Sequence, residues 1–137
     1  NYEKMVIDEE EGKFAVTEYA VIENAGRAAA FVAFWPRTGR THQIRVHAAQ
    51  ALGCSILGDG KYRAVKDEES KLIDADLAGM RLAKRLHLHA RRLIMPHPMQ
   101  KGKVIDVTAP LCPDLVKSWK SLGFNHKDKQ DPFELID

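Results

Sequence analysis

The chain has 137 residues, which suffice for one small domain around a single hydrophobic core. Hydrophobic residues make up 45% of the sequence, but no apolar run approaches the roughly 18 residues of a membrane span, which favours a soluble protein. Two widely separated cysteines, Cys54 and Cys112, lack the spacing of a zinc site, so we expect reduced thiols in a cytoplasmic protein. Because the sequence opens with Asn rather than Met, we also expect a fragment of a longer protein.

Positive charge is unevenly distributed along a chain whose net charge is only +2. Residues 37–63 contain five cations and one acid, Asp59, while residues 81–103 contain seven cations and no acid. One interpretation is a strongly positive surface that binds a polyanion. The other is that these are scattered, solvated side chains, and composition alone leaves both open.

Two apolar segments in the first third predict a β-hairpin. The acidic residues 1–13 end in a turn-like break, after which residues 14–23 alternate well enough for a strand. Residues 24–27 form a loop, and residues 28–35 return as a second strand, apolar enough to be buried on both faces. Pro36 ends this strand.

The segment after the hairpin predicts a short amphipathic helix over residues 41–52. Thr41 is the expected N-cap and Gly53 the expected stop. Three apolar residues recur at a spacing of four and predict the buried face: Ile44, Ala48 and Leu52. The flanking positions carry cations and amides, and the helix N-terminus beside Arg40 predicts an anion site. This polar face suits a negatively charged partner.

The middle of the chain predicts a short strand, a glycine turn and a charged helical region. Residues 54–57 predict the strand, and residues 58–62 a tight turn that carries Lys61 and Tyr62, whose ring can stack on a base. Residues 67–84 predict either one amphipathic helix or two short ones.

The following residues predict a second hairpin. Residues 85–95 alternate at their start, which places His87, His89 and Arg91 on one face of a strand. Residues 104–108 predict the strand that pairs with it.

A helix over residues 114–122, ended by Gly123, is the last predicted element. Residues 124–137 are expected to form a loose tail, pinned by Phe133 and Leu135. Together the elements predict an α+β fold with a largely antiparallel mixed sheet and flanking helices.

Two kinds of catalytic chemistry find little support in these residues. His42 and His47 are five positions apart, whereas two ligands on one helix face are usually four apart, and no carboxylate or cysteine is close in sequence, so no metal site is expected. Cys54 follows a helix end rather than a helix start, so it lacks an activating environment. Asp59, between two glycines, is expected to form a turn. The residues alone predict a polyanion-binding face without a complete catalytic set.

Three motifs, in this order and spacing, closely resemble the C-terminal half of RNA pseudouridine synthases that act on the large ribosomal subunit. They are Thr38-Gly-Arg-Thr-His-Gln-Ile-Arg-Val-His47, then Gly58-Asp59 with Lys61-Tyr62, then Leu86-His-Leu-His-Ala90 with His97-Pro98. The resemblance covers about residues 14–122. It implies that residues 1–137 are the C-terminal part of a pseudouridine synthase catalytic domain.

The resemblance implies isomerisation of uridine to pseudouridine in ribosomal RNA, without metal or cofactor, on a base flipped out of the RNA helix. In the family an aspartate attacks the nucleotide and pairs with the arginine of the His-Gln-Ile-Arg segment, here Arg45. A paired arginine keeps a carboxylate ionised at neutral pH, as a nucleophile requires. Further expected RNA-binding residues are Arg37, Arg40, Thr41, His42, Gln43, His47, Lys61, Tyr62, Arg63, His87, His89 and Arg91.

The sequence departs from the family in one respect. The family's aspartate segment, His-Arg-Leu-Asp followed by Thr-Ser-Gly, and its catalytic tyrosine are absent from these residues. We therefore expect this fragment alone to be inactive and to need the N-terminal half of the same enzyme. The alternative hypothesis is a non-catalytic RNA-binding module, and a third is that the basic segments hold the missing half.

Overall fold

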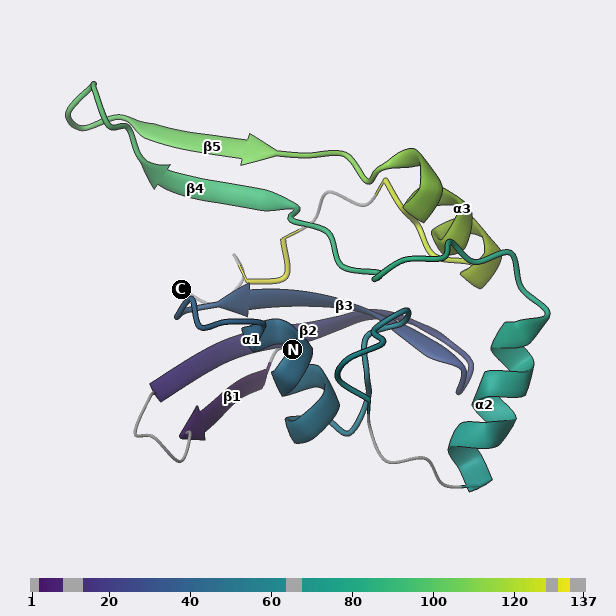
Figure 1. Ribbon diagram of the computed structural model, residues 1–137. Coiled ribbons are helices and arrows are strands. Elements are labelled where there is room, and N and C mark those ends of the chain that lie inside the picture. The colour runs from purple at the N-terminus through teal and green to yellow at the C-terminus, as the bar shows by residue number, and fades with distance from the viewer. Residues whose placement is uncertain (1–2, 9–13, 64–67, 128–130, 134–137) are drawn as a thin grey trace.

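The computed structural model describes residues 3–8, 14–63, 68–127 and 131–133. An antiparallel sheet in the order β1-β2-β3 lies below a separate β4–β5 hairpin, with helices in front and to one side (Figure 1). The expected α+β arrangement with antiparallel pairing is therefore confirmed. In the described part of the chain no helix has the length and apolar character needed to cross a membrane.

The first sheet contains the predicted hairpin and one additional strand. β2 spans Phe14–Ala25 and β3 spans Ala29–Pro36, which confirms the hairpin. β1, Glu3–Asp8, pairs antiparallel with β2 and is missing from the sequence-based prediction. Its six residues, EKMVID, contain as many charged as apolar side chains, so pairing with β2 rather than a local pattern defines it as a strand.

The predicted helix after the hairpin is present, but its start is different. α1 spans Gln43–Val46 and its N-cap is His42, not Thr41. His42 adopts the left-handed conformation at φ 51°, and its side chain caps no backbone group of the described residues. The expected cap at Thr41 is therefore wrong, because the chain turns into the helix one residue later.

The helix continues as a π-helix, η1, over His47–Ala51. A π-turn closes its hydrogen bonds at five residues, as in the Leu52 N–H to His47 carbonyl bond of 3.1 Å, and so shifts the inward face. Of the expected stripe at a spacing of four, only Ala48 is buried, and its neighbours His47 and Ala49 are buried with it, while Ile44 and Leu52 are partly exposed. The expected stop is confirmed, since Gly53 adopts φ 68°.

Two predicted strands are irregular segments. Residues 54–57 and 85–91 form no ladder; they lie side by side, joined by a 2.8 Å hydrogen bond from the His87 N–H to the Leu57 carbonyl. The regular pairing begins later, with β4 at Arg92–Pro96 and β5 at Val104–Thr108. Alternation at residues 86–90 was therefore a misleading strand signal.

The two remaining helices agree with the prediction. α2, Glu68–Ala78, is a single helix, which decides between the two alternatives. α3 spans Pro113–Leu122 and ends at Gly123, whose φ of 80° is the expected left-handed cap.

The buried apolar side chains of the core come from β2 (Ala15, Val16 and Ala20), from η1 (Ala48 and Ala49) and from α3 with the residues that follow it (Leu115 and Phe124). Leu115 is fully buried, and Phe31 packs against both Trp119 and Phe124, with ring centroids 5.4 and 5.7 Å apart. The tail is pinned by Phe133 as expected, since its ring lies 5.5 Å from that of Trp35. The expected contact of Leu135 lies outside the described residues.

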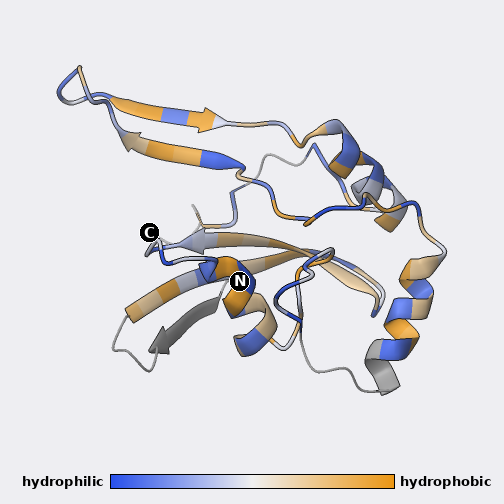
Figure 2. Cartoon of the chain, in the orientation of Figure 1, coloured by the Kyte–Doolittle hydropathy of each residue, from blue (hydrophilic) through white to orange (hydrophobic). Residues whose placement is uncertain are grey.

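The β4–β5 hairpin carries an uncovered apolar face. Leu93 pairs with Val107 and Met95 with Ile105, so these four side chains share one face. Leu93 is 58% exposed and Val107 56%. Figure 2 shows both strands as mostly hydrophobic and extending away from the rest of the structure. We call these four residues the apolar hairpin face.

Candidate functional site around Arg45

Gly58 brings the second and third motifs of the sequence into contact. It adopts φ 84°, and a Cβ placed on it would lie 1.9 Å from the carbonyl oxygen of Arg85. Only glycine permits both the backbone conformation and this approach. The turn that carries Asp59 is thereby fixed against residues 85–87.

Asp59 binds Arg45 through two parallel hydrogen bonds. Arg45 Nε donates to Oδ2 at 2.9 Å and Nη2 donates to Oδ1 at 2.7 Å. Asp59 Oδ1 also accepts from the backbone N–H groups of Lys61 and Tyr62, both at 3.0 Å. The Asp59 side chain is completely buried, while that of Arg45 is 20% exposed. This geometry orients the guanidinium group and leaves its outer edge accessible.

The ionisation of this pair follows from its hydrogen bonds. The bonds from Arg45 hold the pKa of the Asp59 carboxyl well below its usual range, with the two backbone N–H groups adding to the effect against the opposing effect of burial. The same pairing raises the pKa of Arg45. Asp59 is therefore a permanent anion whose oxygens are occupied, so it serves to position Arg45 and is unsuited to nucleophilic attack.

His42 and Tyr62 form a second pair beside the first. His42 Nδ1 and the Tyr62 hydroxyl are 2.9 Å apart, and the two rings pack edge to face with centroids 5.5 Å apart. The Tyr62 ring also lies 5.1 Å from the Arg45 guanidinium carbon and 5.4 Å from Lys61 Nζ, distances at which a cation is attracted to an aromatic face. We call His42, Arg45, Asp59 and Tyr62 the Arg45 cluster.

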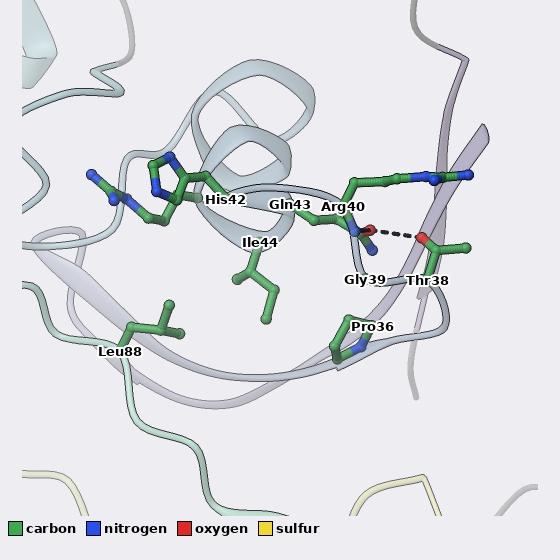
Figure 3. Close-up of a pocket in the computed structure, with 9 residues that line it drawn as sticks. Pro36, Thr38, Gly39, Arg40, His42, Gln43, Ile44 and Leu88 are labelled. Carbon is green, nitrogen blue, oxygen red and sulfur yellow. Dashed lines mark hydrogen bonds between the residues drawn. The ribbon is translucent and has the colours of Figure 1, made fainter. Parts of the chain in front are cut away.

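Two of the four residues of the Arg45 cluster lie at an open cavity of about 290 Å³. His42 and Arg45 line one part of it, and the apolar side chains of Pro36, Ile44 and Leu88 line another. In Figure 3 Ile44 points into this space between Pro36 and Leu88. The cavity thus combines an apolar surface, suited to the face of a ring, with hydrogen-bond donors at its edge.

Gln43, one of the expected RNA-binding residues, is a buried structural link. Its amide oxygen accepts from Thr38 Oγ1 at 2.6 Å and from the Arg40 N–H at 3.1 Å. Its amide nitrogen donates to the Val16 carbonyl at 2.8 Å and to Thr17 Oγ1 at 2.9 Å. Gln43 therefore ties the loop before α1 to β2, and its amide is committed to the chain itself.

His47 is also buried, with 2% of its surface exposed, and its Nδ1 is hydrogen-bonded to Thr17 Oγ1. This residue fastens η1 to β2. Its position in the interior removes it from the surface that RNA can touch.

Arg37 and Arg40 lie apart from the Arg45 cluster. Arg37 Nε donates to Glu18 Oε2 at 2.6 Å, which compensates a carboxylate whose side chain is only 6% exposed, and the guanidinium group stacks on Trp35 at 3.4 Å. Arg40 Nε donates to the Phe14 carbonyl at 3.3 Å. Figure 3 shows the side chains of Arg40 and His42 pointing in opposite directions.

His87, His89 and Arg91, expected on one RNA-facing strand face, make internal hydrogen bonds. His87 Nε2 is 2.8 Å from Ser118 Oγ, and its ring stacks on Trp119. His89 Nε2 and Arg91 Nη1 both reach the Ala109 carbonyl, at 3.2 and 2.6 Å. These residues hold segment 85–91 against α3 and the chain before it.

The remaining expected contacts are exposed. Thr41, Lys61 and Arg63 lie on the surface, the last two on either side of Tyr62 in the chain, and can meet a ligand. Among the described residues, no group of three His, Cys, Asp or Glu side chains is arranged to hold a metal ion.

The sequence reasoning missed the partner of Arg45. Asp59 was interpreted only as a turn former, although it also binds the guanidinium group. No local pattern indicated this bond, because the two residues are 14 positions apart and meet only in the folded chain. The local sequence pattern did not predict that Leu88 lines the cavity.

Comparison with known proteins identifies the family. A family model described as RNA pseudouridylate synthase matches residues 2–50. An uncharacterised RNA pseudouridine synthase of Zymomonas mobilis is 39% identical over 120 residues, 87% of this chain and 45% of the relative. The dual-specificity RNA pseudouridine synthase RluA of Salmonella typhi is 43% identical over 98 residues, 72% of this chain and 39% of the relative.

A further relative is the ribosomal large subunit pseudouridine synthase C of Rickettsia typhi, 35% identical over 105 residues, which are 77% of this chain and 30% of the relative. The chain belongs to the RNA pseudouridine synthase family, as its motifs predicted. It spans less than half the length of these curated relatives.

Proposed function

We propose that this chain is part of a cytoplasmic enzyme that isomerises uridine to pseudouridine in large-subunit ribosomal RNA. In this reaction the bond from ribose C1′ to uracil N1 is broken and a bond from C1′ to uracil C5 is formed. The hydrogen leaves C5, and N1 ends with a proton, so no electrons are gained or lost. The chemistry therefore calls for charge stabilisation and positioning by side chains.

One observation carries the proposal: a bidentate carboxylate holds Arg45 at the edge of a partly apolar cavity. Asp59 occupies Nε and Nη2, and no described residue accepts a hydrogen bond from Nη1. A second carboxylate can therefore bind the outer edge of the same guanidinium group. We assign that place to the catalytic aspartate of the family, which Arg45 would keep ionised.

RNA contact in this proposal comes from exposed side chains near the cavity. Lys61 and Arg63 supply cations for phosphates, and Thr41 a hydroxyl group. Arg40 adds a further cation at the opposite end, where its hydrogen bond to a backbone carbonyl leaves the positive charge uncompensated by any acid among the described residues. Arg37 neutralises Glu18 and contributes little.

The apolar hairpin face supports the proposal that the N-terminal half of the same enzyme completes the domain. A lone two-stranded hairpin is marginally stable in water, and four apolar residues on one face need a cover. The relatives are more than twice as long as the part they share with this chain. We therefore propose that the N-terminal half covers the β4–β5 hairpin and also brings its aspartate to the outer edge of Arg45.

The proposal is tested by replacing Arg45 with Ala in the full-length protein. Release of tritium from C5 of uridine in a large-subunit RNA transcript measures isomerisation, and filter binding of the same RNA measures affinity. We expect turnover to fall at least about 100-fold, because an ionised aspartate loses its partner, with RNA affinity changed by less than about tenfold. A matched control is Arg27→Ala, an exposed arginine whose partner, Asp76, is itself half exposed.

The outcomes separate two functions. If the Arg45→Ala variant isomerises uridine at a rate close to that of the wild type, Arg45 does not have the role proposed for it. RNA binding without any isomerisation by the full-length wild type would instead favour the non-catalytic RNA-binding module.

A further inference from the structure

His42 has a backbone conformation that its side chain does not favour. It is the one residue other than glycine with positive φ in the described part of the chain. Glycine adopts this conformation without steric cost, whereas a residue with a Cβ does not. Such residues cluster at functional sites, where surrounding contacts hold them. A histidine at this position therefore calls for a reason in its side chain.

The side chain is not used to stabilise the helix. It caps no backbone group of the described residues, and its ring is exposed at the cavity. Its hydrogen-bond partner is the Tyr62 hydroxyl, 2.9 Å from Nδ1. Nε2 has no hydrogen-bond partner among the described residues.

His42 Nδ1 and the Tyr62 hydroxyl share one hydrogen bond, in which either group can donate. When the Tyr62 hydroxyl donates to Nδ1, the proton resides on Nε2, and Nε2–H becomes a donor directed away from Tyr62. His42 and Arg45 both contact the Tyr62 ring and line the same cavity.

Tyr62 is itself held rigidly. Its backbone N–H donates to Asp59, which binds Arg45, and its ring is contacted by the Arg45 and Lys61 cations. Arg45, Asp59 and Tyr62 thus contact one another, and His42 joins them through the Tyr62 ring and hydroxyl.

We propose that Tyr62 is a positioning residue that orients His42, so that His42 Nε2–H donates to an oxygen of the RNA at the edge of the cavity. The inference rests on the proposed function and adds to it a specific hydrogen-bond donor, His42 Nε2–H, and the residue that orients it, Tyr62. Two RNA oxygens offer the same chemistry, a backbone phosphate and a base carbonyl.

Two single variants and their combination test the pair in the full-length protein. Tyr62→Phe keeps the ring and its cation contacts but removes the hydroxyl. His42→Gly removes the donor and relieves the backbone conformation. We expect each to weaken binding of the RNA transcript about fivefold or more, and the double variant to be no weaker than His42→Gly, because the hydroxyl acts only through His42.

A stability measurement separates this role from a structural one. Tm of His42→Gly should be unchanged or higher, since glycine suits the left-handed conformation, although RNA binding falls. Tyr19→Phe, which removes a hydroxyl on β2 outside the Arg45 cluster, serves as the matched control and should bind like the wild type. His42→Asn, which tolerates positive φ and retains an N–H donor, should recover part of the affinity.

Two RNA substrates distinguish the acceptors. If a methylphosphonate beside the target uridine removes the difference between wild type and His42→Gly, the partner is a phosphate; if an abasic target nucleotide removes it, the partner is a base carbonyl. The inference is overturned, with the proposed function left standing, if Tyr62→Phe binds RNA as tightly as the wild type. It is also overturned if the losses of RNA affinity in the two single variants multiply in the double variant. Failure of the wild type to bind RNA would overturn the proposed function as well.

Discussion

At the scale of single residues, the site depends on a carboxylate that does no chemistry. Asp59 is buried, accepts four hydrogen bonds and holds Arg45 in one orientation. Arginine suits this task because its planar fork matches a carboxylate on one edge and leaves further N–H groups on the other. Lysine has no such geometry.

Removal of the Asp59 charge should therefore destabilise the fold. We expect Asp59→Asn to lower Tm at pH 7 by about 5–10 °C, because the fork loses an ionic partner in a buried turn. The folded-state pKa of Asp59 lies below its unfolded value, so this contribution is fully present above about pH 4 and is lost as the pH falls further through the folded-state pKa. Urea unfolding of both proteins at pH 7, 5 and 3 checks this. A difference in unfolding free energy between the two proteins that is as large at pH 3 as at pH 7 would contradict the assignment.

At the scale of elements, the site is assembled by two irregular segments rather than by strands. The turn at Gly58 and the segment 85–87 meet through backbone contacts, and α1 delivers His42 and Arg45 to the same place. A glycine without a Cβ is the condition for this meeting.

Gly58→Ala should be far more damaging than Gly102→Ala. The two glycines have nearly equal φ, 84° and 83°, but a Cβ at Gly102 meets no atom within 4 Å, whereas at Gly58 it meets the Arg85 carbonyl. The pair therefore separates steric clash from conformational strain. We expect Gly102→Ala to cost about 1 kcal/mol of unfolding free energy and Gly58→Ala at least about 2 kcal/mol more. If chemical denaturation shows equal losses of unfolding free energy in the two variants, the close approach of Gly58 to the Arg85 carbonyl does not matter for stability.

Elements with strong local signals could be predicted from the sequence, and those defined by tertiary contacts could not. The β2–β3 hairpin, β5 and α3 follow from alternation, turn residues and a glycine cap. β1 depends on its pairing with β2, and segment 85–91 alternates without being a strand because His87 and Arg91 bond to other parts of the chain.

The same distinction applies to the site. Arg45 and His42 could be selected from the motif that carries them; both line the cavity, and their catalytic and RNA-binding roles stay predictions. The burial of Gln43 and His47 could not be predicted. Gln43 is held inside by the bonds of its amide to Val16 and Thr17 of β2, and His47 begins the π-helix, which changes which side of the helix faces β2. The bond between Arg45 and Asp59 links residues 14 positions apart and required the folded chain.

At the scale of the whole molecule, the chain presents an incomplete surface. The apolar hairpin face extends beyond the sheet and core, and exposed apolar faces of this kind drive association. Arg92 strengthens the opposite face by binding Asp106 and Asp131, so the hairpin is held in place while its apolar face stays open.

The 137-residue chain by itself should therefore self-associate. In sedimentation velocity we expect concentration-dependent species larger than the monomer at tens of micromolar, and a shift to monomer when Leu93 and Val107 are both replaced by Lys. The matched control is Leu72→Lys, which changes a comparably exposed leucine, 52%, on α2. A wild-type chain that stays monomeric would argue against a missing cover on the hairpin.

The central claim is that Arg45 acts through its two-sided fork, with Asp59 on one edge and a catalytic carboxylate on the other. Single-turnover isomerisation by the full-length Arg45→Lys variant tests it most directly, because lysine keeps the charge but cannot bind both carboxylates in this geometry. We predict a rate at least about 100-fold below wild type, with RNA affinity within about threefold. A lysine variant that turns over at a rate close to wild type would contradict the claim.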